Sequence, residues 1–155
     1  MRYAWGAILL LLAILAEILT ATATQLPIPF FLLTAFYLDV ATKTGWVTLP
    51  FAILLDLAFA RRIPITIAPC LAALLVAFLW KKYGHLKSTL PQILPALVLS
   101  GLSLGVLFLY AGGISDRMLL GHLLGAILFP ILLPCLDALA RLAKLPRYKN
   151  ANERK

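Results

Sequence analysis

The sequence predicts an all-α polytopic membrane protein in which six transmembrane helices form one bundle. Of its 155 residues, 63% are hydrophobic and only 13% are charged, with a mean hydropathy of +0.98. That balance is far from the composition of a soluble globular domain. Apolar runs also recur along nearly the whole chain, with short connections between them. We therefore predict a single membrane domain over residues 1–145, followed by a basic, disordered tail over residues 146–155.

Proline, glycine, charged and aromatic residues mark the ends of the predicted spans. The spans are residues 5–23, 26–40, 46–60, 63–80, 91–110 and 118–139. The first resembles a secretory signal, since Arg2 precedes an apolar stretch that ends in Ala-Thr-Ala. It is long enough to cross a bilayer and more spans follow, so we expect a retained helix. The third span is shorter than the roughly 20 residues that an upright helix needs, which suggests burial in the bundle or local membrane thinning.

The distribution of basic residues predicts the orientation of the chain. Most Lys and Arg residues lie in the connections on the same side as the two ends of the chain, and only Arg61, Arg62 and Arg117 lie on the other side. Under the positive-inside rule, both termini are predicted to be cytoplasmic, in a multi-pass protein of the inner membrane. The net charge of +8 suits anionic lipid headgroups as a partner of the tail. No basic patch is interleaved with aromatic residues, so nucleic acid is not expected as a partner.

The third span places one acid, Asp56, inside an apolar run and is followed by Arg61 and Arg62. An ionised carboxylate at bilayer depth is costly and usually finds a partner. The two arginines lie one to two helical turns beyond the acid, so they are its expected partners. We predict that Asp56 holds this short span in register and presents the arginine pair to a periplasmic protein.

Further polar residues fall at a similar depth. At 1.5 Å per residue, Asp56 lies ~15 Å beyond Trp46 and Glu17 lies ~18 Å beyond Trp5. His122 lies at the outer start of the sixth span. The residues that could converge on one outward-facing cluster are Glu17, Asp56, Arg61, Arg62 and His122. Such a cluster is either a site for a ligand, ion or partner, or a set of ion pairs and hydrogen bonds that fix helix register.

Catalytic and metal-binding patterns are not found in this sequence. It has two histidines and no HExxH motif, and Ser100 and Ser103 lie on a Gly-rich apolar run without a G-x-S-x-G elbow. Cys70 and Cys135 lie inside apolar runs without CxxC spacing, which favours small packing residues over ligands or a disulfide. We therefore expect a protein that is not an enzyme and that binds no metal or cofactor.

Two motifs indicate close helix packing. Gly101 and Gly105 form one GxxxG motif, and Gly121 and Gly125 form a second. Small residues at this spacing let helix backbones approach closely. The motifs serve either packing inside one bundle or a homodimer face.

The C-terminal end of the sixth span predicts an ion pair. Asp137 and Arg141 are i,i+4 neighbours on one helical face, and Lys144 follows on that face. We expect the helix to continue as an amphipathic extension up to Pro146. That extension would lie on anionic headgroups or dock onto a cytoplasmic protein.

The chain resembles the rod shape-determining protein MreD family in its size, its six predicted spans and its third span. There the stretch 52–57, AILLDL, is similar to that family's apolar G-L-L-x-D-L stretch, although Phe51-Ala52 replaces the glycine and Ala60-Arg61-Arg62 replaces a glycine-containing turn. The resemblance implies a non-enzymatic inner-membrane scaffold of cell elongation and peptidoglycan synthesis. Its implied partners are an MreC-like periplasmic protein, an actin-like filament protein and wall synthases. The implied fold is similar to the substrate-binding subunits of energy-coupling-factor transporters.

That fold supplies an alternative function. A membrane subunit of a transporter that binds a vitamin or an ion would use the polar cluster as its pocket. Such subunits need loops that cap the ligand, and the outer connections here are short. An enzyme of lipid or peptide chemistry ranks last, because no catalytic constellation is present.

Overall fold

The computed structural model describes residues 2–42, 45–58, 67–83 and 89–145, and these residues form helices with no β-strand among them. The helices are α1 (Arg2–Thr24), α2 (Phe30–Ala41), α3 (Thr48–Ala58), α4 (Ile67–Tyr83), α5 (Thr89–Ala111) and α6 (Asp116–Leu142), with a 3₁₀ turn over Gly45–Val47 before α3. The all-α class is therefore confirmed. Each predicted span corresponds to one helix.

The helix ends differ from the prediction where local chemistry outweighs hydropathy. Helix α2 begins at Phe30 rather than at residue 26, because Pro27 and Pro29 lack N–H groups and disfavour helix in the residues before them. Helix α6 begins two residues early, at Asp116. The Ser115 hydroxyl accepts a hydrogen bond from the Met118 N–H at 3.3 Å and so caps the helix. An apolar run thus marks the position of a helix but not its ends.

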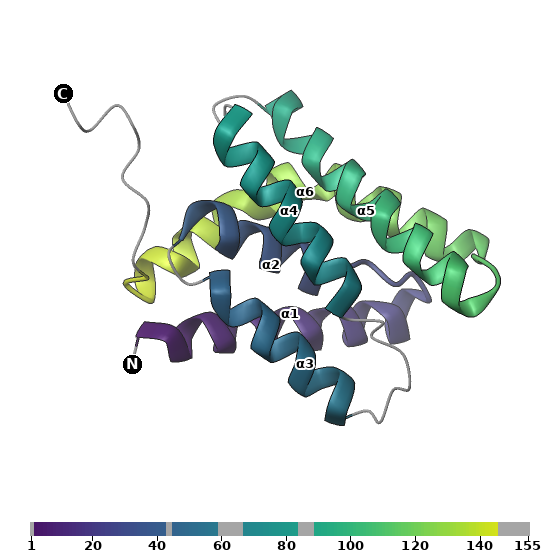
Figure 1. Ribbon diagram of the computed structural model, residues 1–155, viewed down its shortest axis with the longest axis horizontal. Coiled ribbons are helices and arrows are strands. Elements are labelled where there is room, and N and C mark those ends of the chain that lie inside the picture. Colours follow the sequence, from purple (N-terminus) through teal and green to yellow (C-terminus); the bar gives the residue numbers. More distant parts are fainter. Residues whose placement is uncertain (1, 43–44, 59–66, 84–88, 146–155) are drawn as a thin grey trace.

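Helix α2 is the central element of the fold. Every residue from 31 to 40 is buried, and the helix packs against α1, α4, α5 and α6. Most of its residues are apolar, as expected for a fully surrounded helix. Figure 1 shows α2 behind α4, with α1 and α3 on one side and α5 and α6 on the other.

Two hydrophobic clusters meet on α2. One joins α2 to α1, α3, α4 and the end of α6, and includes Leu10, Leu38 and Cys70. The other joins α2 to α4, α5 and α6, and includes Phe36 and Phe129, whose ring centroids lie 5.9 Å apart. Opposite faces of one helix therefore hold the two halves of the molecule together.

The outside of the molecule is apolar as well. Helices α1, α3, α4, α5 and α6 all expose large hydrophobic side chains; Leu109 is 79% exposed and Leu142 is 80% exposed. Soluble monomers rarely expose continuous apolar surface on this scale. Two helices, Ala4–Thr24 within α1 and Asp116–Leu142, are long and apolar enough to cross a membrane.

The helices alternate in direction, which gives the molecule two distinct ends (Figure 1). Helices α1, α3 and α5 finish at one end, where α2, α4 and α6 begin; we call this the turn end. The opposite end, which we call the terminal end, carries the start of α1 and the end of α6. Candidate sites are found at both ends.

Candidate functional site

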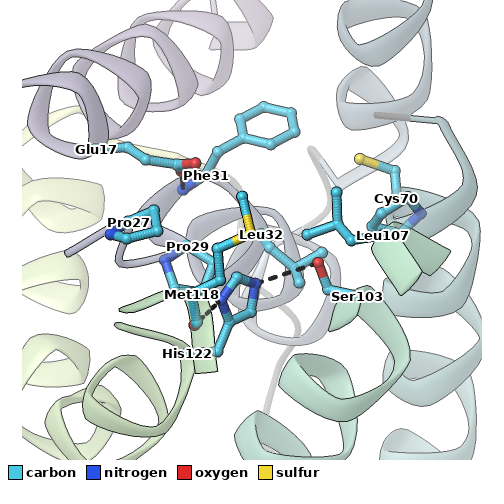
Figure 2. A pocket seen from close by; sticks show the side chains of 11 residues that line it. Glu17, Pro27, Pro29, Phe31, Leu32, Cys70, Ser103, Leu107, Met118 and His122 are labelled. Carbon is cyan, nitrogen blue, oxygen red and sulfur yellow. Dashed lines mark hydrogen bonds between the residues drawn. The ribbon is translucent and has the colours of Figure 1, made fainter. Parts of the chain in front are cut away.

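A cavity of about 440 Å³ lies between helices at the turn end (Figure 2). Its walls are mostly apolar, and its polar side chains come from α1, α5 and α6. The lining residues are Glu17, Pro27, Pro29, Phe31, Leu32, Pro69, Cys70, Ser103, Leu107, Met118 and His122. Two of the residues expected in the outward-facing cluster, Glu17 and His122, thus line one cavity.

On the α1 side of the cavity, Glu17 is tied to the beginning of α2. Its Oε2 accepts a hydrogen bond from the Phe31 N–H at 3.1 Å, and Figure 2 shows the carboxylate turned toward that backbone group. The first N–H groups of a helix have no partner within the helix and carry partial positive charge. Glu17 therefore caps α2 from a neighbouring helix, a role that Pro29 at the N-cap position does not fill with its own side chain.

On the opposite side, His122 links α6 to α5. Its Nδ1 lies 2.9 Å from the Met118 carbonyl oxygen and its Nε2 lies 3.4 Å from the Ser103 hydroxyl (Figure 2). A carbonyl can only accept, so Nδ1 carries the proton, and in the neutral ring Nε2 accepts from Ser103. The Ser100 hydroxyl also donates to the His122 carbonyl at 3.2 Å. Two hydrogen bonds thus join the two helices across a buried contact.

Two glycines of α6 allow the connection between α1 and α2 to pack closely beside the cavity. A Cβ at Gly121 would lie 2.6 Å from the Pro27 carbonyl oxygen, and one at Gly125 would lie 3.0 Å from Pro29 Cδ. Gly101 and Gly105 differ, because both are exposed and a Cβ on either would meet nothing within 4 Å. Packing within the described bundle therefore explains the motif on α6 but not the motif on α5.

Asp56 does not line the cavity, although it lies at the same end of the molecule. It is buried on α3, and its Oδ2 accepts a hydrogen bond from the Ile67 N–H, the first residue of α4, at 3.2 Å. Asp56 thus caps α4 in the way that Glu17 caps α2. Arg61 and Arg62 lie outside the described residues, so their pairing with Asp56 stays a prediction.

The cavity offers hydrogen-bonding groups on apolar walls. His122 and Ser103 form a contact that a nucleophile and its base could use, but the other ring nitrogen is held by a backbone carbonyl and not by a carboxylate. Within the described ranges, His, Cys, Asp and Glu residues form no group of three that could hold a metal ion. What the cavity can do chemically is hold a small polar or amphipathic group.

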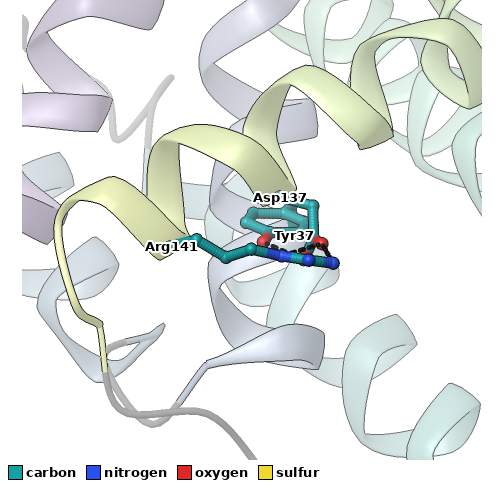
Figure 3. Close-up of polar contacts among 3 residues, drawn as sticks. All are labelled: Tyr37, Asp137 and Arg141. Atoms are coloured by element: carbon teal, nitrogen blue, oxygen red, sulfur yellow. Dashed lines mark hydrogen bonds and ion pairs between the residues drawn. The ribbon is translucent and has the colours of Figure 1, made fainter.

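At the terminal end, α6 is tied to the central helix by a polar triad (Figure 3). The Arg141 guanidinium donates to Asp137 Oδ2 from Nη2 at 2.7 Å and from Nε at 3.1 Å, so the predicted ion pair is confirmed. The Tyr37 hydroxyl donates to Asp137 Oδ1 at 3.1 Å. Sequence reasoning missed Tyr37, because it is 100 residues away and nothing in the local pattern points to α6.

Helix α6 ends sooner than the predicted extension to Pro146. The Leu145 N–H donates to the Ala140 carbonyl and the Lys144 N–H donates to the Arg141 carbonyl, both at 3.0 Å. Lys144 adopts a positive φ of 49°, which closes the helix, and Leu145 folds back into the core. The basic tail, residues 146–155, lies outside the described residues.

Comparison with known proteins assigns no relative to this chain: no protein-family model matches the sequence, and no curated protein or solved structure matches it.

Proposed function

We propose that this chain is a non-enzymatic scaffold of the bacterial inner membrane that acts in cell elongation and peptidoglycan synthesis, as MreD-family proteins do. The observation that carries the proposal is the contacts made by its buried and partly buried polar groups. Glu17 and Asp56 cap neighbouring helices, and His122 joins α5 to α6. These polar side chains hold the helices in position. Such a role favours a rigid platform that binds other proteins over a reaction centre.

In this proposal all six helices cross the membrane, and both termini face the cytoplasm. The apolar exterior supports that arrangement, because large hydrophobic side chains cover the outer faces of five helices. The turn end would then face the periplasm and meet the MreC-like partner. The terminal end would meet the actin-like filament protein and the wall synthases, with the tail on anionic headgroups.

Depletion in a rod-shaped host tests the scaffold function. Loss of the protein is expected to round the cells, and re-expression is expected to restore rods. In the same strain, Asp56→Asn should lower co-purification of the periplasmic partner, whereas Asp116→Asn, an exposed acid at the start of α6, should not. Unchanged cell shape after depletion would overturn the proposal.

The cavity at the turn end favours a second candidate, a membrane subunit that binds a vitamin or an ion for a transporter. Its volume of about 440 Å³ lies within the range of small-molecule pockets, and Glu17, Ser103 and His122 would orient the ligand. A ligand of this kind would raise the unfolding temperature of the purified protein. A screen of vitamins and metal ions without any such shift would eliminate this candidate.

A further inference from the structure

A buried acid at the terminal end is not explained by the packing of the bundle. Asp39, near the end of α2, is 5% exposed, and its Oδ2 is buried without a hydrogen-bond partner among the described residues. A buried carboxylate oxygen without a donor is costly, and such groups normally contact water, an ion or a ligand. Gly45 packs directly against this acid, because a Cβ at Gly45 would collide with the Asp39 side chain and backbone.

Asp39 lines a cavity of about 260 Å³ whose lining includes both charged and apolar side chains. Lys81, at the end of α4, lines the same cavity and interacts electrostatically with Asp39. The rest of the lining is Thr42, Gly45, Trp46, Leu74, Ala77 and Phe78. Trp46 and Phe78 are both exposed, so aromatic surface continues from the cavity to the outside of the molecule.

The position of the cavity fits the interface of a membrane. Lys81 and Trp46 lie at helix ends, and tryptophan and lysine are typical of the headgroup region. Phe78 and Leu74 lie about one and two turns before Lys81 on α4, which is the level of the apolar acyl chains in the proposed orientation. The polar end and the apolar end of the cavity therefore follow the direction of a lipid molecule.

The two charges define the chemistry of the occupant. Asp39 offers a buried acceptor, and Lys81 offers a cation that would repel a bare metal ion and attract an anion. A ligand that carries both a primary ammonium and a phosphate satisfies both side chains. We propose that this cavity binds the headgroup of phosphatidylethanolamine, with the ammonium donating to Asp39 and the phosphate against Lys81. The assignment to the inner leaflet rests on the orientation given under the proposed function.

Related headgroups lack one of the two features. Phosphatidylcholine carries a quaternary ammonium without an N–H, so it cannot donate a hydrogen bond to Asp39. Phosphatidylglycerol has the phosphate but no ammonium, so it leaves Asp39 without a cationic partner. Selectivity for phosphatidylethanolamine over both lipids is therefore the signature of this site.

Thermal unfolding of the purified full-length chain, washed extensively in detergent, tests the proposal. The probes are short-chain phosphatidylethanolamine, phosphatidylcholine and phosphatidylglycerol, together with soluble phosphoethanolamine. We expect phosphatidylethanolamine to raise the unfolding temperature at about tenfold lower concentration than the other two lipids. Equal effects of the three lipids would overturn the proposal, and so would protection by soluble phosphoethanolamine without protection by the lipid.

Two variants assign the effect to this cavity. Asp39→Asn keeps the size of the side chain but removes its charge, and Lys81→Gln alters an exposed residue whose loss does not disturb the core. Each is expected to weaken protection by phosphatidylethanolamine about tenfold, whereas Asp116→Asn at the opposite end leaves it unchanged. Undiminished protection by phosphatidylethanolamine in Lys81→Gln, which does not depend on the folding of the Asp39 variant, would contradict the assignment. Cell shape after depletion is a separate measurement, so either proposal can fail without the other.

Discussion

At the level of single residues, two acids within the helices perform the same task. Glu17 on α1 and Asp56 on α3 each accept a hydrogen bond from the beginning of the helix that follows. The N-terminal N–H groups of a helix carry partial positive charge, so a carboxylate is well stabilised there even in apolar surroundings. Each acid therefore fixes the geometry of one helical hairpin.

The first prediction concerns Asp56. Asp56→Ala removes the acceptor for the Ile67 N–H and is expected to cost about 1–2 kcal/mol in the free energy of unfolding. Asp56→Asn keeps an amide oxygen in place and should cost less than the alanine variant. Unfolding followed by circular dichroism in mild detergent measures both.

Asp116→Ala serves as the control for that comparison, because Asp116 is an exposed acid in the first turn of α6 and is expected to change the stability little. If Asp56→Ala unfolds at the same point as the wild type, the carboxylate does not hold α4.

The sequence predicts that these acids lie at a similar depth, but it does not reveal their partners. The sequence predicts a pairing of Asp56 with Arg61 or Arg62, which lie outside the described residues. It does not predict the backbone N–H of Ile67 that Asp56 Oδ2 contacts across the connection between α3 and α4. The sequence cannot identify a backbone N–H as the partner of a particular acid, since every residue except proline has one. Asp39 was overlooked for a related reason: it lies near the end of an apolar run, where an acid is usually solvated, and only the tertiary fold buries it.

At the level of helices, the two GxxxG motifs have different surroundings. The motif on α6 faces the connection between α1 and α2, and the motif on α5 faces outward. Glycine spacing indicates that another segment of backbone can approach the helix closely, but it does not indicate which segment does so. The apolar runs predicted every helix, whereas the choice of partner depends on contacts far apart in sequence.

The second prediction uses this difference as a matched pair. Gly121→Ala places a methyl group against the Pro27 backbone and is expected to destabilise the protein by about 1–3 kcal/mol. Gly101→Ala meets open space and removes a flexible residue from a helix, so its effect should be neutral or slightly stabilising. Thermal unfolding of both variants in the same detergent checks the contrast.

A loss of stability in Gly101→Ala equal to that in Gly121→Ala would contradict this account of the two motifs. A change of oligomeric state in Gly101→Ala alone, measured by size-exclusion chromatography with light scattering, would indicate that the motif on α5 contacts a second copy of the chain.

At the level of the whole molecule, the buried central helix and the apolar exterior are related features of the packing. Helix α2 takes part in both hydrophobic clusters, so the helices around it can turn their remaining apolar faces outward. In water such an exterior would promote aggregation, whereas in a bilayer it contacts acyl chains. Composition alone predicts a membrane environment, because so high a fraction of apolar residues is far from the balance of a soluble globular domain.

The third prediction is the topology of the chain in the membrane. The excess of Lys and Arg on the side of the two ends predicts that a fluorescent protein fused at the C-terminus folds in the cytoplasm and fluoresces. Alkaline phosphatase is active only in the periplasm. Fused after Gly113, between α5 and α6, it should give activity on the order of tenfold above the same enzyme fused at the C-terminus, because the two points lie on opposite sides of the bilayer. Equal activities would mean that α6 does not cross the membrane, and the reverse order would place the terminal end, with Asp39 and Lys81, at the outer leaflet.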